Sequence, residues 1–206
     1  MRVRASGFVL LSQLSTVPRI RAQLRGELPH IALPDGLPGI TSGFAFRPET
    51  AKPMRELAEV LLRGSNTLTS AEREMIAAFV SGRNDCHFCH ASHRAAAAHH
   101  MNGSYEVVDA VKHDYLSAPV SPKLKALLVI AAKVQVSGKQ VATADVERAR
   151  GVGATDREIH DTVLIAAAFC MFNRYVDGLA TLTPTDEQAY DMMGQRMAKE
   201  GYVRRA

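Results

Sequence analysis

The sequence has few cysteines, no long apolar run and no block of basic residues, and each shortage excludes a class of protein. Three cysteines in 206 residues are too few for a secreted domain held together by disulfides, so we expect a cytoplasmic protein in a reducing compartment. No segment reaches the ~18 uninterrupted apolar residues of a membrane-spanning helix, and no membrane partner is expected. The net charge of +4 is spread along the chain without a lysine or arginine stripe, so no nucleic-acid partner is expected either.

Residues 1–28 are interpreted as an N-terminal arm followed by a short helix. Basic residues precede the apolar run 7–11, but that run is too short for the core of a signal peptide. Pro18 opens a predicted helix over 17–28. Because 47% of the residues are hydrophobic, the rest of the chain can bury a sizeable core, and residues 29–206 are predicted to form a single domain.

That domain is predicted to be all-helical. Proline and glycine make residues 29–48 an extended loop, whose apolar residues Ile31, Leu33, Leu37 and Ile40 are expected to pack on the helical body. Beyond the loop, apolar residues recur three and four positions apart. Helices are expected over residues 49–63, 70–81, 86–101, 105–112, 123–136, 143–150, 155–182 and 185–200. The last of these is polar and is expected at the periphery.

The segment 69–101 carries most of the readable chemistry. Thr69 and Glu72 have the T-x-x-E spacing of a capping box, in which each side chain satisfies a backbone donor at a helix start. The spacing predicts a helix that begins near Ser70, and its apolar pattern is lost at Gly82.

A second helix is expected directly after this one. Asn84 and Asp85 are favourable caps for a helix over 86–101. Helices joined by so short a turn lie antiparallel, so residues equally far from the turn face each other. Glu74 and His93 are such residues, and their carboxylate and imidazole are predicted to meet across the hairpin.

The second helix begins with a C-x-x-C pair. Cys86, Cys89 and His93 follow the spacing i, i+3 and i+7, which places them on one stripe of the helix. The free N–H groups of a first turn favour thiolate, so a depressed thiol pKa is predicted. A histidine one turn further can accept the thiol proton, and Glu74 behind it can fix the tautomer. The four residues would form a relay that ends in a dithiol.

Other polar residues have simpler interpretations. His90, His99 and His100 do not share the stripe of the cysteines and are interpreted as a polar helix face. Cys170 lies in an apolar segment and is interpreted as an inert buried thiol. Thr155 begins a second T-x-x-E box before another long helix, which is consistent with an internal duplication and equally with chance, because such boxes are common at helix starts.

Glu74, Cys86, Cys89 and His93 match all four positions of a known signature. The segment around them resembles the alkylhydroperoxidase D and carboxymuconolactone decarboxylase family, whose signature is a Glu, a Cys twelve residues later, and then Cys at plus three and His at plus seven. The resemblance extends more weakly over most of the chain, as in the subgroup called peroxidase-related enzymes.

This resemblance implies an alkylhydroperoxidase D-like helical domain that assembles into trimers or hexamers. It implies a thiol-dependent peroxidase that needs no bound cofactor, with a hydroperoxide as substrate. Cys89 would attack the peroxide with help from His93 and Glu74, Cys86 would close the disulfide, and an external dithiol or redox protein would reduce it. The decarboxylase branch generally lacks the cysteine pair, so the pair favours redox chemistry.

Two alternatives stay open. The well-studied hydroperoxidases have a histidine immediately before the second cysteine, where this chain has Phe88, so a thiol–disulfide oxidoreductase or a redox sensor is also consistent with the motif. A zinc-binding module would use Cys86, Cys89, His93 and a fourth ligand. One helix spaces Cys86 and His93 about 10 Å apart, which strains tetrahedral bonds of ~2.0 to 2.3 Å.

Overall fold

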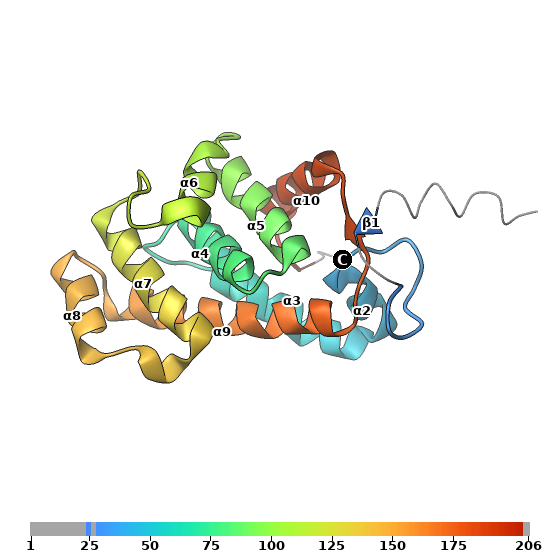
Figure 1. Cartoon of the computed structure of the whole chain (residues 1–206), viewed down its shortest axis with the longest axis horizontal. Coiled ribbons are helices and arrows are strands. Elements are labelled where there is room, and N and C mark those ends of the chain that lie inside the picture. Colours follow the sequence, from blue (N-terminus) through green and yellow to red (C-terminus); the bar gives the residue numbers. More distant parts are fainter. Residues whose placement is uncertain (1–23, 26–27, 204–206) are drawn as a thin grey trace, which may run out of the picture.

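Helices form most of the computed structural model, which describes residues 24–25 and 28–203 (Figure 1). In chain order they are α2 (Ile40–Phe46), α3 (Pro48–Arg63), α4 (Ser70–Arg83), α5 (His87–His100), α6 (Glu106–Asp114), α7 (Pro122–Val136), the 3-10 helix η2 (Gly138–Gln140), α8 (Thr143–Gly151), α9 (Asp156–Gly178) and α10 (Glu187–Glu200). Two short strands, β1 (Leu24–Arg25) and β2 (Thr183–Pro184), form an antiparallel pair. The predicted all-α class is confirmed.

Helix α4 begins where its capping box predicts. Thr69 Oγ1 accepts the backbone N–H of Glu72 at 3.2 Å, and the Glu72 carboxylate accepts the backbone N–H of Thr69 at 2.9 Å. These bonds satisfy donors that a helix start leaves free. Arg73 then donates to the carbonyls of Leu61 and Gly64 at 3.0 and 2.9 Å, which ties the start of α4 to the end of α3.

The start of α5 differs from the prediction. Its N-cap is Cys86, and Asp85 lies in the left-handed region with a φ of 58°. The side-chain amide of Asn84 donates to Asn173 Oδ1 on α9 at 2.8 Å. The prediction that Asn84 and Asp85 cap α5 is therefore wrong, because the tertiary partner on α9 takes up the Asn84 side chain and holds the turn.

Helix α5 packs between α4 and α10 (Figure 1). The alanine run 95–98 is almost fully buried, and α10 approaches it through Gly194. A Cβ atom at Gly194 would lie only 2.4 Å from the Cβ of Ala95, so no larger residue fits there. Tyr190 of α10 is also buried. Most of the other side chains of α10 are exposed or half-buried, as expected of a polar helix at the periphery, and only this contact with α5 is tightly packed.

On the other side, α7 and α9 pack against α4 and each other. The core there is aliphatic and aromatic, with Leu127, Ile130, Ile165 and Phe169 buried. The second capping box also forms: Thr155 Oγ1 accepts the backbone N–H of Glu158 at 3.2 Å. Both predicted boxes are present in the structure, and the internal duplication stays a prediction.

The N-terminal part departs from the prediction. Residues 40–46, expected within an extended loop, form α2. Ile31 and Leu37 are 43% and 36% exposed, whereas Ile40 packs against the core as expected. Residues 24–25 form β1 where a helix over 17–28 is predicted, and the predicted arm and most of that helix lie outside the described residues.

Replacing Gly194 with alanine is expected to lower the free energy of unfolding by about 1–3 kcal/mol, although alanine is the better helix former. The reason is that the new Cβ would overlap Ala95 and Ala96. The matched control is Gly178→Ala, where a Cβ would meet no atom within 4 Å. Urea unfolding followed by circular dichroism compares the variants, and equal stability would contradict the close packing of α10 on α5.

Candidate active site

Glu74 of α4 and His93 of α5 meet across the two helices. His93 Nδ1 lies 2.7 Å from Glu74 Oε2, and Glu74 is fully buried. Because a carboxylate only accepts hydrogen bonds, we assign the proton of the neutral imidazole to Nδ1, which leaves Nε2 as the basic nitrogen. The predicted approach of these two side chains is present in the structure.

A second donor to Glu74 comes from the segment after α10. The Tyr202 hydroxyl donates to Glu74 Oε1 at 2.5 Å, and the Tyr202 ring lies nearly parallel to that of His93, with centroids 6.0 Å apart. Burial raises the pKa of Tyr202 well above its usual value, and the charge of Glu74 adds to this effect. The phenol therefore keeps its proton and remains a donor at neutral pH. Sequence reasoning misses Tyr202 because it lies 128 residues from Glu74 and no local pattern marks it.

The third contact that fixes the imidazole is aromatic. Phe169 of α9 meets the His93 ring edge to face, with centroids 4.6 Å apart and an interplanar angle of 87°. Phe169 is itself buried, so it cannot easily move away. Together with Glu74 and Tyr202, it holds His93 in one orientation.

The two cysteines occupy the first turn of α5 but differ in their surroundings. Cys86 is the N-cap, and Cys86 and Cys89 are both buried, at 1% and 4% exposure. A hydrogen bond to Cys89, reinforced by burial, raises the pKa of the Cys86 thiol. For Cys86 the predicted depression of the pKa is therefore wrong, because the neighbouring sulfur and the loss of water outweigh the partial positive charge of the first turn.

Cys86 has another polar neighbour in Asp177 of α9. The Asp177 carboxylate near this thiol also contributes to the raised pKa of Cys86, because a neighbouring negative group disfavours the thiolate. Burial raises the pKa of Asp177, and the nearby Cys86 thiol offsets part of that rise. Asp177 therefore helps to hold the proton on Cys86. Sequence reasoning does not pair the two, because they lie on helices that are distant in the chain.

Cys89 and His93 line the same cavity, which has a volume of about 1150 Å³. Its wall is largely apolar and includes Ile40, Phe44, Met54, Phe88, Phe169 and Phe172. Cys86 and Glu74 are not part of the lining. In the described part of the chain, no hydrogen bond joins His93 to Cys89. A ligand in the cavity would therefore meet the Cys89 sulfur and the imidazole together.

Phe88, which precedes Cys89, forms part of this wall. Its ring fits against Gly39, where a Cβ atom would lie 2.1 Å from the ring. Gly39 also has a φ of 53°, a conformation that glycine adopts without strain. The chain thus presents an apolar surface at the position before Cys89.

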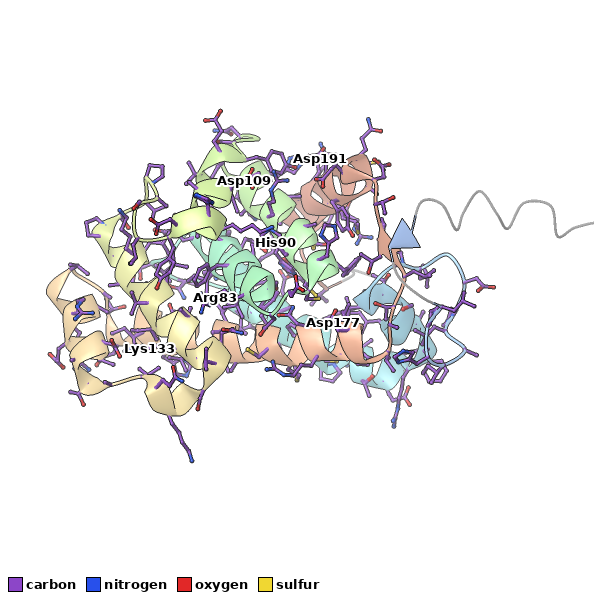
Figure 2. The ribbon with its side chains drawn as sticks, in the orientation of Figure 1. Arg83, His90, Asp109, Lys133, Asp177 and Asp191 are labelled. Carbon is purple, nitrogen blue, oxygen red and sulfur yellow. The ribbon has the colours of Figure 1, made fainter. Side chains whose placement is uncertain are left out.

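The other histidines of α5 do not join the Glu74–His93 pair. His99 Nε2 lies 2.9 Å from Asp191 Oδ1 on α10. His90 is only 5% exposed, and its Nδ1 lies 2.9 Å from the Ala78 carbonyl oxygen of α4 (Figure 2). The interpretation of His90 as part of a solvated face is wrong, because this residue faces α4. Burial lowers the pKa of His90 to about 4.

Within residues 24–25 and 28–203, no three His, Cys, Asp or Glu side chains are grouped so that they could hold a metal ion. Over the same residues, none of the helices has the length and apolar character that crossing a membrane requires.

Comparison with known proteins identifies the family. The model of the carboxymuconolactone decarboxylase family matches residues 48–114, which include the four signature residues. A solved structure of an uncharacterized peroxidase-related protein from Silicibacter sp. TM1040 has 30% sequence identity and a TM-score of 0.67, over 75% of this chain and 78% of that one. The chain belongs to the carboxymuconolactone decarboxylase family.

Further solved structures support this membership. One from Ralstonia eutropha JMP134, described as an alkylhydroperoxidase AhpD core and an uncharacterized peroxidase-related protein, has 29% identity and a TM-score of 0.68, over 84% of this chain and 96% of that one. A protein of unknown function from Agrobacterium tumefaciens, at 20% identity and a TM-score of 0.60 over 70% of this chain and 97% of that one, has the same fold. A search of curated proteins found no match.

The buried His90 is expected to make stability depend on pH. In the unfolded chain it takes up a proton near its usual pKa of 6.5, whereas the folded protein resists protonation until about pH 4. The contribution of His90 to the free energy of unfolding is fully present above pH 6.5. It decreases by on the order of 3 kcal/mol as the pH falls towards 4. His90→Gln, which can still donate to Ala78, should flatten the change in urea-unfolding free energy between pH 7 and pH 5. The exposed His113→Gln is the control, and an unchanged slope in His90→Gln would contradict the assignment.

Removing the Tyr202 hydroxyl is expected to weaken the site. Tyr202→Phe leaves Glu74 Oε1 without its donor inside the protein, which should cost about 1–3 kcal/mol in unfolding free energy. It should also change the pH profile with which iodoacetamide alkylates Cys89. The control is Tyr115→Phe: its ring packs on Phe79 at 5.0 Å, and its hydroxyl makes no hydrogen bond to any residue the structure describes. If both variants had the same unfolding free energy and the same pH profile of Cys89 alkylation, a role for Tyr202 would be excluded.

Proposed function

We propose that the protein is a thiol-dependent hydroperoxide reductase in which Cys89 is the nucleophile. The observation that carries this proposal is that Cys89 and His93 open on one cavity, with Glu74 and Tyr202 behind the imidazole. The raised pKa of Cys86 separates the roles of the two thiols. The peroxidase-related names of similar proteins from the same family support the reaction class.

In the first step the hydroperoxide lies between Cys89 and His93. The Cys89 thiol gives its proton to Nε2 of His93, and the thiolate attacks the terminal oxygen of the hydroperoxide. A sulfur–oxygen bond forms as the oxygen–oxygen bond breaks. The imidazolium, stabilised by the Glu74 carboxylate, returns the proton to the leaving alkoxide. The products are an alcohol and the sulfenic acid of Cys89.

In the second step Cys86 attacks the sulfenic sulfur of Cys89. A disulfide forms and hydroxide leaves, which becomes water with the proton of Cys86. Asp177, which lies near Cys86, would take up that proton and pass it on. An external dithiol or a redox protein then reduces the disulfide and restores both thiols.

A second candidate reaction uses the same residues. Phe88 gives an apolar wall where the hydroperoxidases that the motif resembles have a histidine, so one proton carrier next to Cys89 is missing. A thiol–disulfide oxidoreductase needs less proton transfer to the leaving group, because a thiolate leaves more easily than an alkoxide. In that case Cys89 would attack a disulfide substrate.

Thiol counting after one equivalent of an organic hydroperoxide tests the proposal. The unmodified protein should lose the thiols of Cys86 and Cys89 and consume the peroxide. Cys89→Ser should lower consumption by more than about 100-fold. Cys86→Ser should react once and leave a sulfenic acid that dimedone traps. The control is Cys170→Ser, because Cys170 is not part of the cavity lining.

The outcomes separate the alternatives. Full turnover in Cys89→Ser would overturn the assigned nucleophile. If a small disulfide oxidises the thiols of Cys86 and Cys89 but peroxide does not, the result would favour the oxidoreductase. Stoichiometric zinc in the same protein sample, measured by metal analysis, would favour the metal-binding module instead.

A further inference from the structure

The cavity at Cys89 is apolar in its depth and charged at its rim. Cys89, Phe169 and Phe172 are at most 5% exposed, so the reactive sulfur lies at the inner end. The charged side chains of the lining come from α3 and α10, and Arg196 and Lys199 among them are exposed. A ligand that fills the cavity would therefore have an apolar body and one end near these charges.

The rim carries an excess of positive charge. Glu59 and Arg63 face each other at 3.9 Å and are further engaged by the C-terminal segment, since Tyr202 N–H donates to Glu59 at 2.7 Å and Arg63 donates to the Met197 carbonyl at 3.1 Å. The charged residues of the whole lining are Arg55, Glu59, Arg63, Arg196, Lys199 and Glu200. Cations outnumber carboxylates among them, which favours an anionic group.

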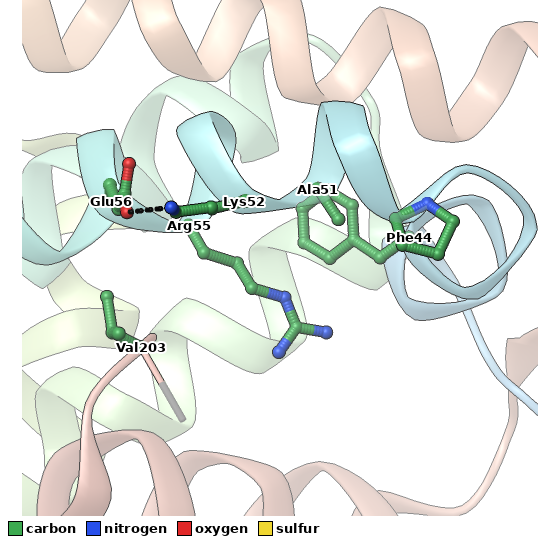
Figure 3. A pocket seen from close by; sticks show the side chains of 7 residues that line it. Phe44, Ala51, Lys52, Arg55, Glu56 and Val203 are labelled. Atoms are coloured by element: carbon green, nitrogen blue, oxygen red, sulfur yellow. Dashed lines mark ion pairs between the residues drawn. The ribbon is translucent and has the colours of Figure 1, made fainter. Parts of the chain in front are cut away.

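Arg55 extends this positive region towards solvent. It projects from α3 into a smaller pocket of about 360 Å³, which shares Phe44, Arg55 and Val203 with the large cavity (Figure 3). The guanidinium lies over the Phe44 ring, 5.0 Å from its centroid. This stacking holds the cation at the mouth next to an apolar surface.

We propose that the cavity binds an amphipathic hydroperoxide, namely the hydroperoxide of a long-chain carboxylic acid. The apolar chain lies along the aromatic and methionine side chains of the wall, the carboxylate lies at Arg55, Arg196 and Lys199, and the hydroperoxide group reaches Cys89. A volume of about 1150 Å³ is slightly larger than the roughly 300–1,000 Å³ typical of small-molecule sites, so a long chain can be accommodated. This inference rests on the proposed function, and its product is the corresponding hydroxy acid.

A pair of substrates that differ only in charge tests the inference. Linoleic acid hydroperoxide and its methyl ester share the chain and the reacting group. The acid should have a higher kcat/KM than the ester, by about fivefold to tenfold, mainly through KM. In the double variant Arg196→Gln/Lys199→Gln this ratio should fall towards one. The matched control is Lys139→Gln/Arg148→Gln, which removes the same charge from exposed positions near α8 and should keep the ratio.

A binding measurement separates this inference from the proposed reaction. Dodecanoate, which cannot react, should bind to the Cys89→Ser protein in calorimetry, and more weakly to that protein with the Arg196 and Lys199 changes added. Peroxide consumption without preference for the acid, or without an effect of the rim variant, would overturn the inference and leave the proposed function standing. Dodecanoate binding that depends on the rim, without any peroxide consumption, would support the anion site and overturn the proposed function.

Discussion

A fully buried carboxylate is the constraint on which the arrangement of the site depends. Glu74 has no contact with solvent, and an ionised carboxylate in such a place costs several kcal/mol unless hydrogen-bond donors replace the lost water. His93 and Tyr202 provide those donors, one to each oxygen. Helices α4 and α5 and the segment after α10 must therefore come together for Glu74 to be accommodated. The same two hydrogen bonds orient the imidazole towards the cavity, so folding and the preparation of the site are coupled.

The first turn of α5 shows how one local motif can produce two different thiols. Cys86 and Cys89 share the helix terminus, yet Cys86 faces Asp177 and the neighbouring sulfur, whereas Cys89 faces the cavity. A buried thiol close to a carboxylate resists ionisation. The cysteines therefore have different roles for two reasons. Helix α9 brings Asp177 close to Cys86, and the cavity lies beside Cys89.

Local signals predicted the helices well where the deciding contacts are themselves local. The capping boxes at Thr69 and Thr155 form, because the side chain and the backbone donor lie within one turn. The cap of α5 was wrong because Asn173 on another helix competes for Asn84. The close approach of α10 to α5 was not predicted, because Gly194 allows it through the absence of a side chain, and hydrophobic periodicity does not register such a contact.

The sequence by itself determined that Glu74 and His93 face each other and that His93 lies one turn after Cys89, since the helical period and a short turn are enough to fix those relations. The tertiary structure alone decided that Tyr202 completes the environment of Glu74, that Asp177 contacts Cys86, and that a long cavity opens at Cys89. These relations join residues from segments far apart in the chain. They depend on how the helix faces pack, which the spacing of residues within a single segment does not encode.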